Sequence, residues 1–179
     1  MTQTAKVYGG SLYDLAVEEN KTEEILTQSG QIRKLFWENP DYLQLLSEPS
    51  LAKEERIKLI QEAFGQEADG YLVNFLKLLC EKGILNEYAG CCDEFVHRYN
   101  VDHNIAEGVV VSAVKLTEEQ LAVLTEKLAA QYEKEIHLVQ RTDATVIGGL
   151  KVELEDIELD GTVKGRLSGI QKKLNDVMI

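Results

Sequence analysis

Apolar residues recur at helical spacing along the first part of the chain, up to about residue 105. The pattern predicts helices over 5–19, 22–37, 50–65, 71–83 and 85–100, with a short helical piece over 41–46. Asn39 should end the second helix, because a residue before proline avoids α geometry. Ser50 can cap the fourth helix and Gly65 can stop it. We therefore expect the N-terminal part to be a six-helix bundle.

The fifth of these segments, YLVNFLKLLCEKG, is apolar on nearly its whole circumference. Such a helix lies in the centre of a bundle or faces a partner. Asn74 is a lone amide within it and would need a hydrogen-bond partner if it were buried. Residues at i, i+3, i+4 and i+7 share one face, and here they are Tyr71, Asn74, Phe75 and Leu78. A groove for an amphipathic helix would use these features, and packing within the chain is the alternative.

The first helix contains residues that are poor helix formers. Gly9, Gly10 and Ser11 are adjacent, and each glycine costs roughly 1 kcal/mol relative to alanine. Small residues also permit the close approach of another chain. Tyr8, Leu12 and Leu15 form the apolar stripe of this helix.

The pattern changes after residue 105, where β-branched and alternating segments begin. EGVVVSAVKL, IHLVQRTD and LKVELEDIEL are predicted strands, the last with a turn at Glu155-Asp156. Thr117 and Gln120 form a capping box at the start of a helix between the first two strands. Thr162 can cap a closing helix with a stripe of Leu167, Ile170 and Leu174. We expect an α+β protein, with the all-α bundle over 1–105 and a small α/β domain over 106–179.

Two segments of the second part resemble ligand-binding loops but lack essential positions. Gly148 and Gly149 are not followed by the lysine of a phosphate-binding loop, so the pair is interpreted as a bend or a close backbone approach. Asp156, Glu158, Asp160 and Gly161 match the start of a calcium loop, yet Lys164 and Leu167 occupy later ligand positions. A solvated strand face with an Asp-Gly turn is the interpretation.

Charge excludes several classes of partner. Nineteen basic against 31 acidic residues give a net charge of -12, which repels nucleic acid and anionic lipid surfaces. The start lacks a secretion signal, and no apolar run approaches the roughly 18 residues that insert into a bilayer. We expect a soluble, cytoplasmic protein without direct membrane insertion.

A thiol or metal enzyme is the alternative from another class. Cys91, Cys92, Asp93 and His97 are the residues that would form its centre, and Cys80 is the third cysteine. Adjacent cysteines point about 100° apart on a helix, and no second pair of ligands exists for a metal. We predict no catalytic residues, no metal and no cofactor, although this alternative and that of an unrelated acidic helical adaptor stay open.

Four segments together resemble the delta subunit of bacterial F-type rotary ATP synthases, a relative of the mitochondrial oligomycin-sensitivity-conferring protein. They are VYGGSLYDLA, CEKGILNEY, IHLVQRTDATVIGGLKVELE and LDGTVKGRL. The resemblance covers essentially the whole chain. Gly9 and Gly10 depart from the family, which more often has alanine and a helix former there, and Thr162 replaces serine.

The resemblance implies a stator subunit without a catalytic centre, on the cytoplasmic face of the cell membrane. Its bundle would bind the N-terminal helix of one alpha subunit, and its C-terminal domain would contact the b-subunit dimer of the peripheral stalk. Torque would then be coupled to ATP synthesis and proton translocation. The residues expected to line the helix-binding groove are Tyr8, Ser11, Leu12, Leu15, Tyr71, Asn74, Phe75 and Leu78. The residues expected to shape the stalk-facing domain are Gly148, Gly149, Leu150, Asp160, Gly161, Arg166 and Leu167.

Overall fold

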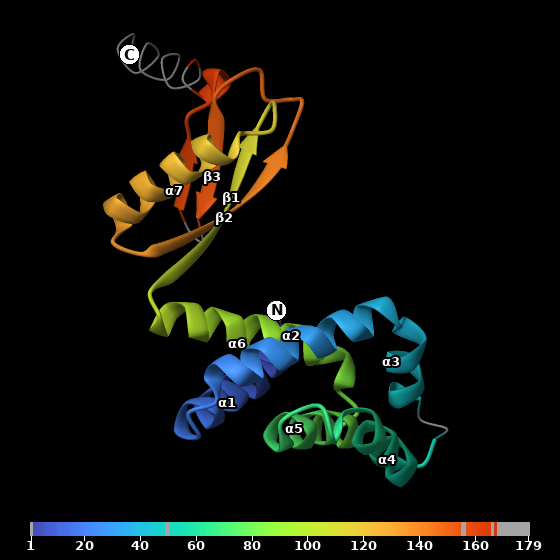
Figure 1. Ribbon diagram of the computed structural model, residues 1–179. Coiled ribbons are helices and arrows are strands. Elements are labelled where there is room, and N and C mark those ends of the chain that lie inside the picture. The colour runs from blue at the N-terminus through green and yellow to red at the C-terminus, as the bar shows by residue number, and fades with distance from the viewer. Residues whose placement is uncertain (1, 49–50, 155–156, 166, 168–179) are drawn as a thin grey trace, which may run out of the picture. The chain divides into compact units, whose positions relative to one another are not determined.

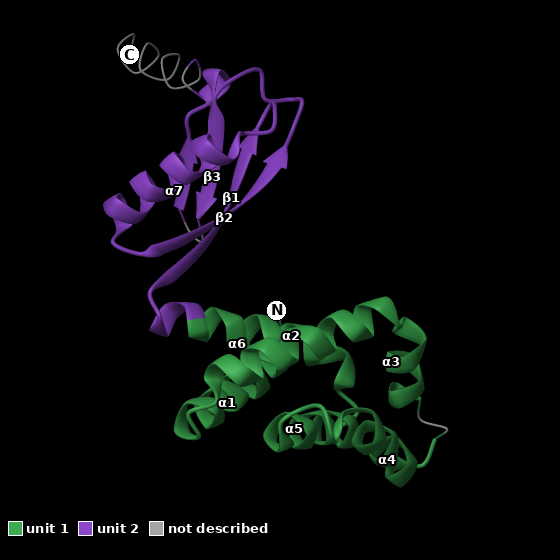
Figure 2. Cartoon of the chain, in the orientation of Figure 1, with its two compact units in different colours: residues 1–99 green, residues 100–179 purple. Residues whose placement is uncertain are grey.

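A computed structural model describes residues 2–48, 51–154, 157–165 and 167. The chain divides into two compact units, residues 1–99 and 100–179 (Figure 2). The first is helical, and the second holds a four-stranded sheet. The Ser50 cap, the Glu155-Asp156 turn and the stripe positions Ile170 and Leu174 lie outside the described residues.

Helices make up the N-terminal unit, and Figure 1 shows them in chain order. They are α1 (Gln3–Glu18), α2 (Thr22–Glu38), α3 (Pro40–Ser47), α4 (Lys53–Phe64), α5 (Gly70–Glu81), the 3₁₀ helix η1 (Leu85–Glu87) and α6 (Tyr88–Asp102). Pro40 takes the first position of α3, where its missing N–H is not needed. Thr2 caps α1 by accepting a hydrogen bond from the Ala5 backbone N–H at 3.1 Å.

The α+β class agrees with the structure, but the predicted six-helix bundle is wrong. The described part of the N-terminal unit contains seven helical segments, because 85–100 is not one helix but η1 followed by α6. Gly83 ends the preceding helix α5 with a positive φ of 68°, and Leu85 is only 1% exposed. Burial of Leu85 fixes a tight turn before α6 starts, and apolar spacing alone does not distinguish that turn from a helix.

The core of this unit is built around α5 and a set of aromatic rings. Six α5 residues are buried, namely Leu72, Val73, Phe75, Leu76, Leu79 and Cys80. On α2, Phe36 has its ring centroid 5.5 Å from that of Tyr88 and 6.0 Å from that of Phe64, both edge to face. These contacts join α2, α4 and α6.

Small residues allow α1 and α6 to pack closely. A Cβ atom added to Gly9 would lie 2.4 Å from the Cys91 carbonyl oxygen, and one added to Gly90 would lie 2.9 Å from the Cβ of Ala5. The glycines of the first helix therefore serve contacts within the chain. Beyond this contact, Arg98 of α6 bonds Asp14 of α1 at 2.9 Å.

The C-terminal unit is a mixed sheet with one helix against it. It contains β1 (Ile105–Ser112), α7 (Glu118–Tyr132), β2 (Glu135–Thr142), β3 (Leu150–Leu154) and β4 (Ile157–Asp160), in the sheet order β2-β1-β3-β4. The β1–β2 pair is parallel, and the other two pairs are antiparallel. Figure 1 shows α7 across one face. There Leu128 packs with Val110, Ile136 and Val152.

The predicted capping box at the start of α7 is confirmed. The Thr117 hydroxyl accepts from the Gln120 backbone N–H at 3.2 Å, and the Gln120 side chain accepts from the Thr117 backbone N–H at 3.0 Å. A two-residue signature in the sequence was sufficient here, because both hydrogen bonds are local.

Replacement of Gly9 by alanine should destabilise the N-terminal unit by about 1–3 kcal/mol, although alanine is the better helix former. The added methyl has to displace the backbone of α6 at Cys91. Urea unfolding followed by the fluorescence of Trp37, the single tryptophan, measures the change. Gly30→Ala in α2 is the control, because its Cβ meets no atom within 4 Å, and it should stabilise by up to about 1 kcal/mol. Equal effects of the two substitutions would contradict the packing argument.

Candidate partner-binding surfaces

The predicted groove residues of α1 differ in their exposure. Leu12 is 4% exposed and belongs to the core, while Tyr8 and Leu15 are half-buried. Ser11 is exposed, and its hydroxyl donates to the Val7 carbonyl at 2.8 Å. This face of α1 therefore offers Ser11 with parts of Tyr8 and Leu15.

The predicted residues of α5 divide in the same way. Phe75 is 8% exposed and packs in the core, with its ring centroid 6.5 Å from that of Tyr88. Tyr71 is half-buried, Leu78 is 40% exposed, and Asn74 is exposed. Since the Asn74 amide is in contact with solvent, it does not need the internal partner that a buried amide would require.

A hollow of about 280 Å³ lies at the start of α5, lined by Lys21, Asp69, Gly70, Tyr71 and Asn74. All eight residues predicted for the helix-binding groove lie in the described part of the chain. Only Tyr71 and Asn74 among them line this hollow. The Tyr71 hydroxyl is hydrogen-bonded to the Glu19 carboxylate, which raises the pKa of Tyr71. The end of α1 and the start of α5 thus lie beside each other.

Asp69 organises this hollow. Its carboxylate accepts from the Tyr71 backbone N–H at 2.8 Å and from Lys21 at 2.5 Å, so one side chain caps α5 and binds the segment between α1 and α2. The Gln28 side chain accepts from the Asp69 backbone N–H at 2.7 Å. Burial acts to raise the pKa of Asp69, but the hydrogen bonds from Lys21 and Tyr71 outweigh it and lower that pKa.

Sequence reasoning missed Lys21 and Asp69. An aspartate directly before a helix is a recognisable cap, so the role of Asp69 at α5 had a local signal. The bond to Lys21 spans 48 positions in the chain and has no such signal.

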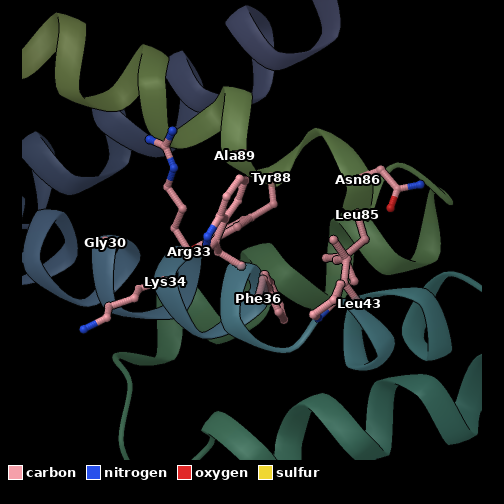
Figure 3. Close-up of a pocket in the computed structure, with 11 residues that line it drawn as sticks. Gly30, Arg33, Lys34, Phe36, Leu43, Leu85, Asn86, Tyr88 and Ala89 are labelled. Carbon is pink, nitrogen blue, oxygen red and sulfur yellow. The ribbon is translucent and has the colours of Figure 1, made fainter.

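A larger groove of about 720 Å³, also missed, lies between α2, α3, η1 and α6 (Figure 3). It is lined by Gly30, Arg33, Lys34, Phe36, Trp37, Pro40, Leu43, Leu85, Asn86, Tyr88 and Ala89. Trp37 is 87% exposed, although it follows the buried Phe36 directly. Its position off the apolar stripe of α2 was the signal available in the sequence.

The glycine pair of the C-terminal unit lies where the chain enters β3. Gly149 has a φ of 84°, and an added Cβ would lie 2.4 Å from the Gly161 carbonyl oxygen. Backbone bonds of 3.0 Å join Gly161 N–H to the Leu150 carbonyl and Val163 N–H to the Gly148 carbonyl. Two segments of main chain thus pass each other at contact distance.

The Asp-Gly turn has its own local bonds. Hydrogen bonds from the Thr162 side chain and from the Thr162 backbone N–H, the latter at 2.9 Å, lower the pKa of Asp160. The Thr162 hydroxyl also accepts from the Gly165 N–H at 3.0 Å. Leu167 is 62% exposed. Arg166 lies outside the described residues.

Residues of three strands line a shallow hollow of about 460 Å³ on the sheet: Glu107, Gly108, Val109, His137, Val139 and Glu153. Val139 is 68% exposed. On β3, Lys151 bonds Glu153 at 2.7 Å and Glu158 at 3.1 Å. The carboxylates of Glu153 and Glu158 are thus used in ion pairs with Lys151.

The cysteines do not form a reactive centre. Burial raises the pKa of the Cys91 thiol to about 11 and that of Cys92 to about 12, so both thiols stay protonated near neutral pH. Asp93 is bound to Arg33 at 2.6 Å, and His97 is exposed. Among the described residues no group of His, Cys, Asp and Glu side chains could hold a metal ion. Within the same part of the chain, no helix is both long and apolar enough to cross a membrane.

Comparison with known proteins identifies relatives over almost the whole chain. The family described as "ATP synthase delta (OSCP) subunit" matches residues 4–174. The "ATP synthase subunit delta" of Lactobacillus delbrueckii subsp. bulgaricus is 31% identical over 173 residues, which is 96% of each chain. That of Clostridioides difficile (strain 630) is 28% identical over 175 residues, 97% of each chain. A chain in a cryo-EM structure of the Toxoplasma gondii mitochondrial ATP synthase hexamer shares the fold, with a TM-score of 0.73, 16% identity and coverage of 97% of this chain and 98% of that one.

The lowered pKa of Asp69 predicts a pH dependence of stability. The unfolded chain binds the proton more readily than the folded one, so this contribution is complete above about pH 3.9, the ordinary pKa of aspartate, and is lost as pH falls through the folded-state pKa. Asp69→Asn keeps a capping side chain but loses the ion pair with Lys21. It should lower the urea midpoint at pH 7, followed by Trp37 fluorescence, and the difference from wild type should shrink at pH 3. A constant difference would contradict this role.

Gly149→Ala should destabilise the C-terminal unit by more than the roughly 1–2 kcal/mol that a left-handed backbone costs other residues, because the added methyl also meets the Gly161 carbonyl. Gly148→Ala is the matched control, since its Cβ would make an ordinary contact of 3.5 Å with Val163. Hydrogen exchange should show faster exchange in β1 and β3 for the first variant only, with the α5 amides unchanged. Equal protection in both variants would refute the argument.

Proposed function

Since the chain belongs to the ATP synthase delta (OSCP) subunit family and is a component of the peripheral stalk, we propose that it joins the catalytic head to the stalk through two separate surfaces. Residues 1–105 carry the surface for the head, and residues 106–179 carry the surface for the stalk. Each part has a hydrophobic core of its own, and this supports the division, because a separate core can keep a separate binding surface in shape. The subunit itself catalyses no reaction and acts at the cytoplasmic face of the membrane.

The N-terminal helix of an alpha subunit is the proposed partner of α1 and α5. Ser11, Asn74 and Leu78 provide exposed groups for it, and Tyr8 and Tyr71 provide half-buried rings. Leu12 and Phe75 lie in the core behind these residues. A contact surface that combines rigid aromatic side chains with a few polar groups suits an amphipathic helix.

The observation that carries the proposal is the hollow that Tyr71 and Asn74 share. A bond of 2.5 Å between Asp69 and Lys21 holds the start of α5 to the short segment that joins α1 to α2. A surface made from two helices keeps its shape only if those helices are fixed to each other. The Asp69 carboxylate provides that constraint, and the Asn74 side chain stays exposed.

The b-subunit dimer is the proposed partner of the C-terminal unit. Support comes from the hollow on its sheet, where Val109 and the exposed Val139 are bordered by Glu107, His137 and Glu153. An apolar centre with a polar border is the usual composition of a contact surface. Gly148, Gly149, Leu150, Asp160 and Gly161 shape the unit rather than touch the stalk, and the same role is proposed for Arg166 and Leu167.

Ser11→Asp and Asn74→Glu should each weaken binding of a labelled peptide from the alpha-subunit N-terminus by about tenfold or more, because each buries an unpaired carboxylate in the contact. Fluorescence polarisation measures the affinity. Thr27→Asp on α2 is the matched control, since Thr27 is also exposed and its hydroxyl also donates to the carbonyl four residues earlier.

The proposed head contact would be misplaced if both variants stayed within about threefold of wild type, or about 0.65 kcal/mol. An equal loss in Thr27→Asp would indicate a general charge effect. Detergent-solubilised membranes provide the second measurement, because the intact chain should co-purify with the synthase and the Ser11→Asp chain should not.

A further inference from the structure

The groove between α2, α3, η1 and α6 differs in charge from the rest of the chain. Its 11 lining residues include the cations Arg33 and Lys34 and no carboxylate, although acidic residues outnumber basic ones by 31 to 19 in the whole sequence. Figure 3 shows Gly30, Arg33 and Lys34 toward one end and Leu43 and Leu85 toward the other. The groove therefore combines an apolar floor with two cations at one end, and each cation has one carboxylate partner outside the lining, Asp93 for Arg33 and Glu38 for Lys34.

Gly30 is not required for any contact among the described residues. A Cβ added there would meet no atom within 4 Å, whereas Gly9 and Gly90 lie in the contact between α1 and α6. Glycine inside a helix costs roughly 1 kcal/mol relative to alanine, and nothing in the described structure uses the space at Gly30. That space would let a second helix approach α2 closely.

The same face of α2 carries Trp37. Gly30, Arg33, Lys34 and Trp37 follow one another at i, i+3, i+4 and i+7 and so lie on one side of the helix. The indole is 87% exposed, and exposed tryptophans are enriched among the residues that contribute most to binding. Phe36, Leu43 and Tyr88 line the same groove.

We propose that this groove binds an amphipathic helix of another protein, with an apolar ridge over Gly30 and Trp37 and carboxylates beside Arg33 and Lys34.

Both cations have N–H donors that their present partners do not use. Lys34 is 76% exposed, and its pair with Glu38 is long at 3.8 Å. One Arg33 nitrogen bonds Asp93, but a guanidinium has five N–H donors. The site uses none of the residues that line the Tyr71–Asn74 hollow and does not depend on the proposed head contact.

Two substitutions separate loss of the site from loss of the fold. Gly30→Leu places its side chain in open space, so the helix should stay folded while the groove is filled. Gly30→Ala adds one methyl group and should have a smaller effect. Lys34→Glu reverses the charge. Lys58→Glu is its match, because Lys58 is also 76% exposed and also pairs with a glutamate four residues later.

The test titrates the full chain with two synthetic helical peptides of about 18 residues, long enough to form a helix on binding. Both have the same leucine ridge, one flanked by glutamates and the other by lysines. Trp37 is the single tryptophan, so its emission reports on this groove directly. The net charge of -12 favours the lysine peptide everywhere else, and a preference for the glutamate peptide would therefore identify the groove.

We expect a saturable blue shift with the glutamate peptide and binding about tenfold weaker with the lysine peptide. Gly30→Leu and Lys34→Glu should each weaken the glutamate peptide by about tenfold and Gly30→Ala by a smaller factor, while Lys58→Glu and Ser11→Asp stay within about threefold. The proposal is overturned if no saturable shift occurs, if both peptides bind equally, or if Gly30→Leu keeps the wild-type affinity. Because Ser11→Asp alters only the proposed head contact, failure of that contact would be distinguishable.

Discussion

Burial of α5 is the constraint on which the N-terminal unit depends. Half of its twelve residues are buried, and burying one leucine or phenylalanine side chain contributes roughly 1.5–3 kcal/mol. A helix with so little polar surface has to be surrounded by other helices. Three of its other six positions, the half-buried Tyr71 and the exposed Asn74 and Leu78, are then held by this buried helix. The same packing that stabilises the fold would also keep the proposed contact surface rigid, which is what a stationary stalk component requires.

The elements with strong periodicity or local capping signals could be predicted from the sequence. The capping box at Thr117, the alternation in β3 and the central position of α5 depend on residues within a few positions of each other. The division of 85–100 into η1 and α6 could not be predicted, because burial of Leu85 depends on the surrounding core.

The candidate surfaces were less predictable than the fold. Gly9 and Gly10 indicated a close approach, but their spacing did not indicate whether another chain or α6 approaches. Lys21 and Asp69 lie 48 positions apart, and the groove beside Trp37 is assembled from four separate elements. Contacts of this kind arise only when the chain is folded, so neither periodicity nor motif spacing contains them.

The three cysteines give the fold a further property. Cys80, Cys91 and Cys92 are all buried, and all belong to the N-terminal unit. An alkylating reagent can reach them only when that unit opens, and the sheet unit has no thiol to react. The rate of alkylation of this chain therefore measures how often its N-terminal unit opens, independently of the C-terminal unit.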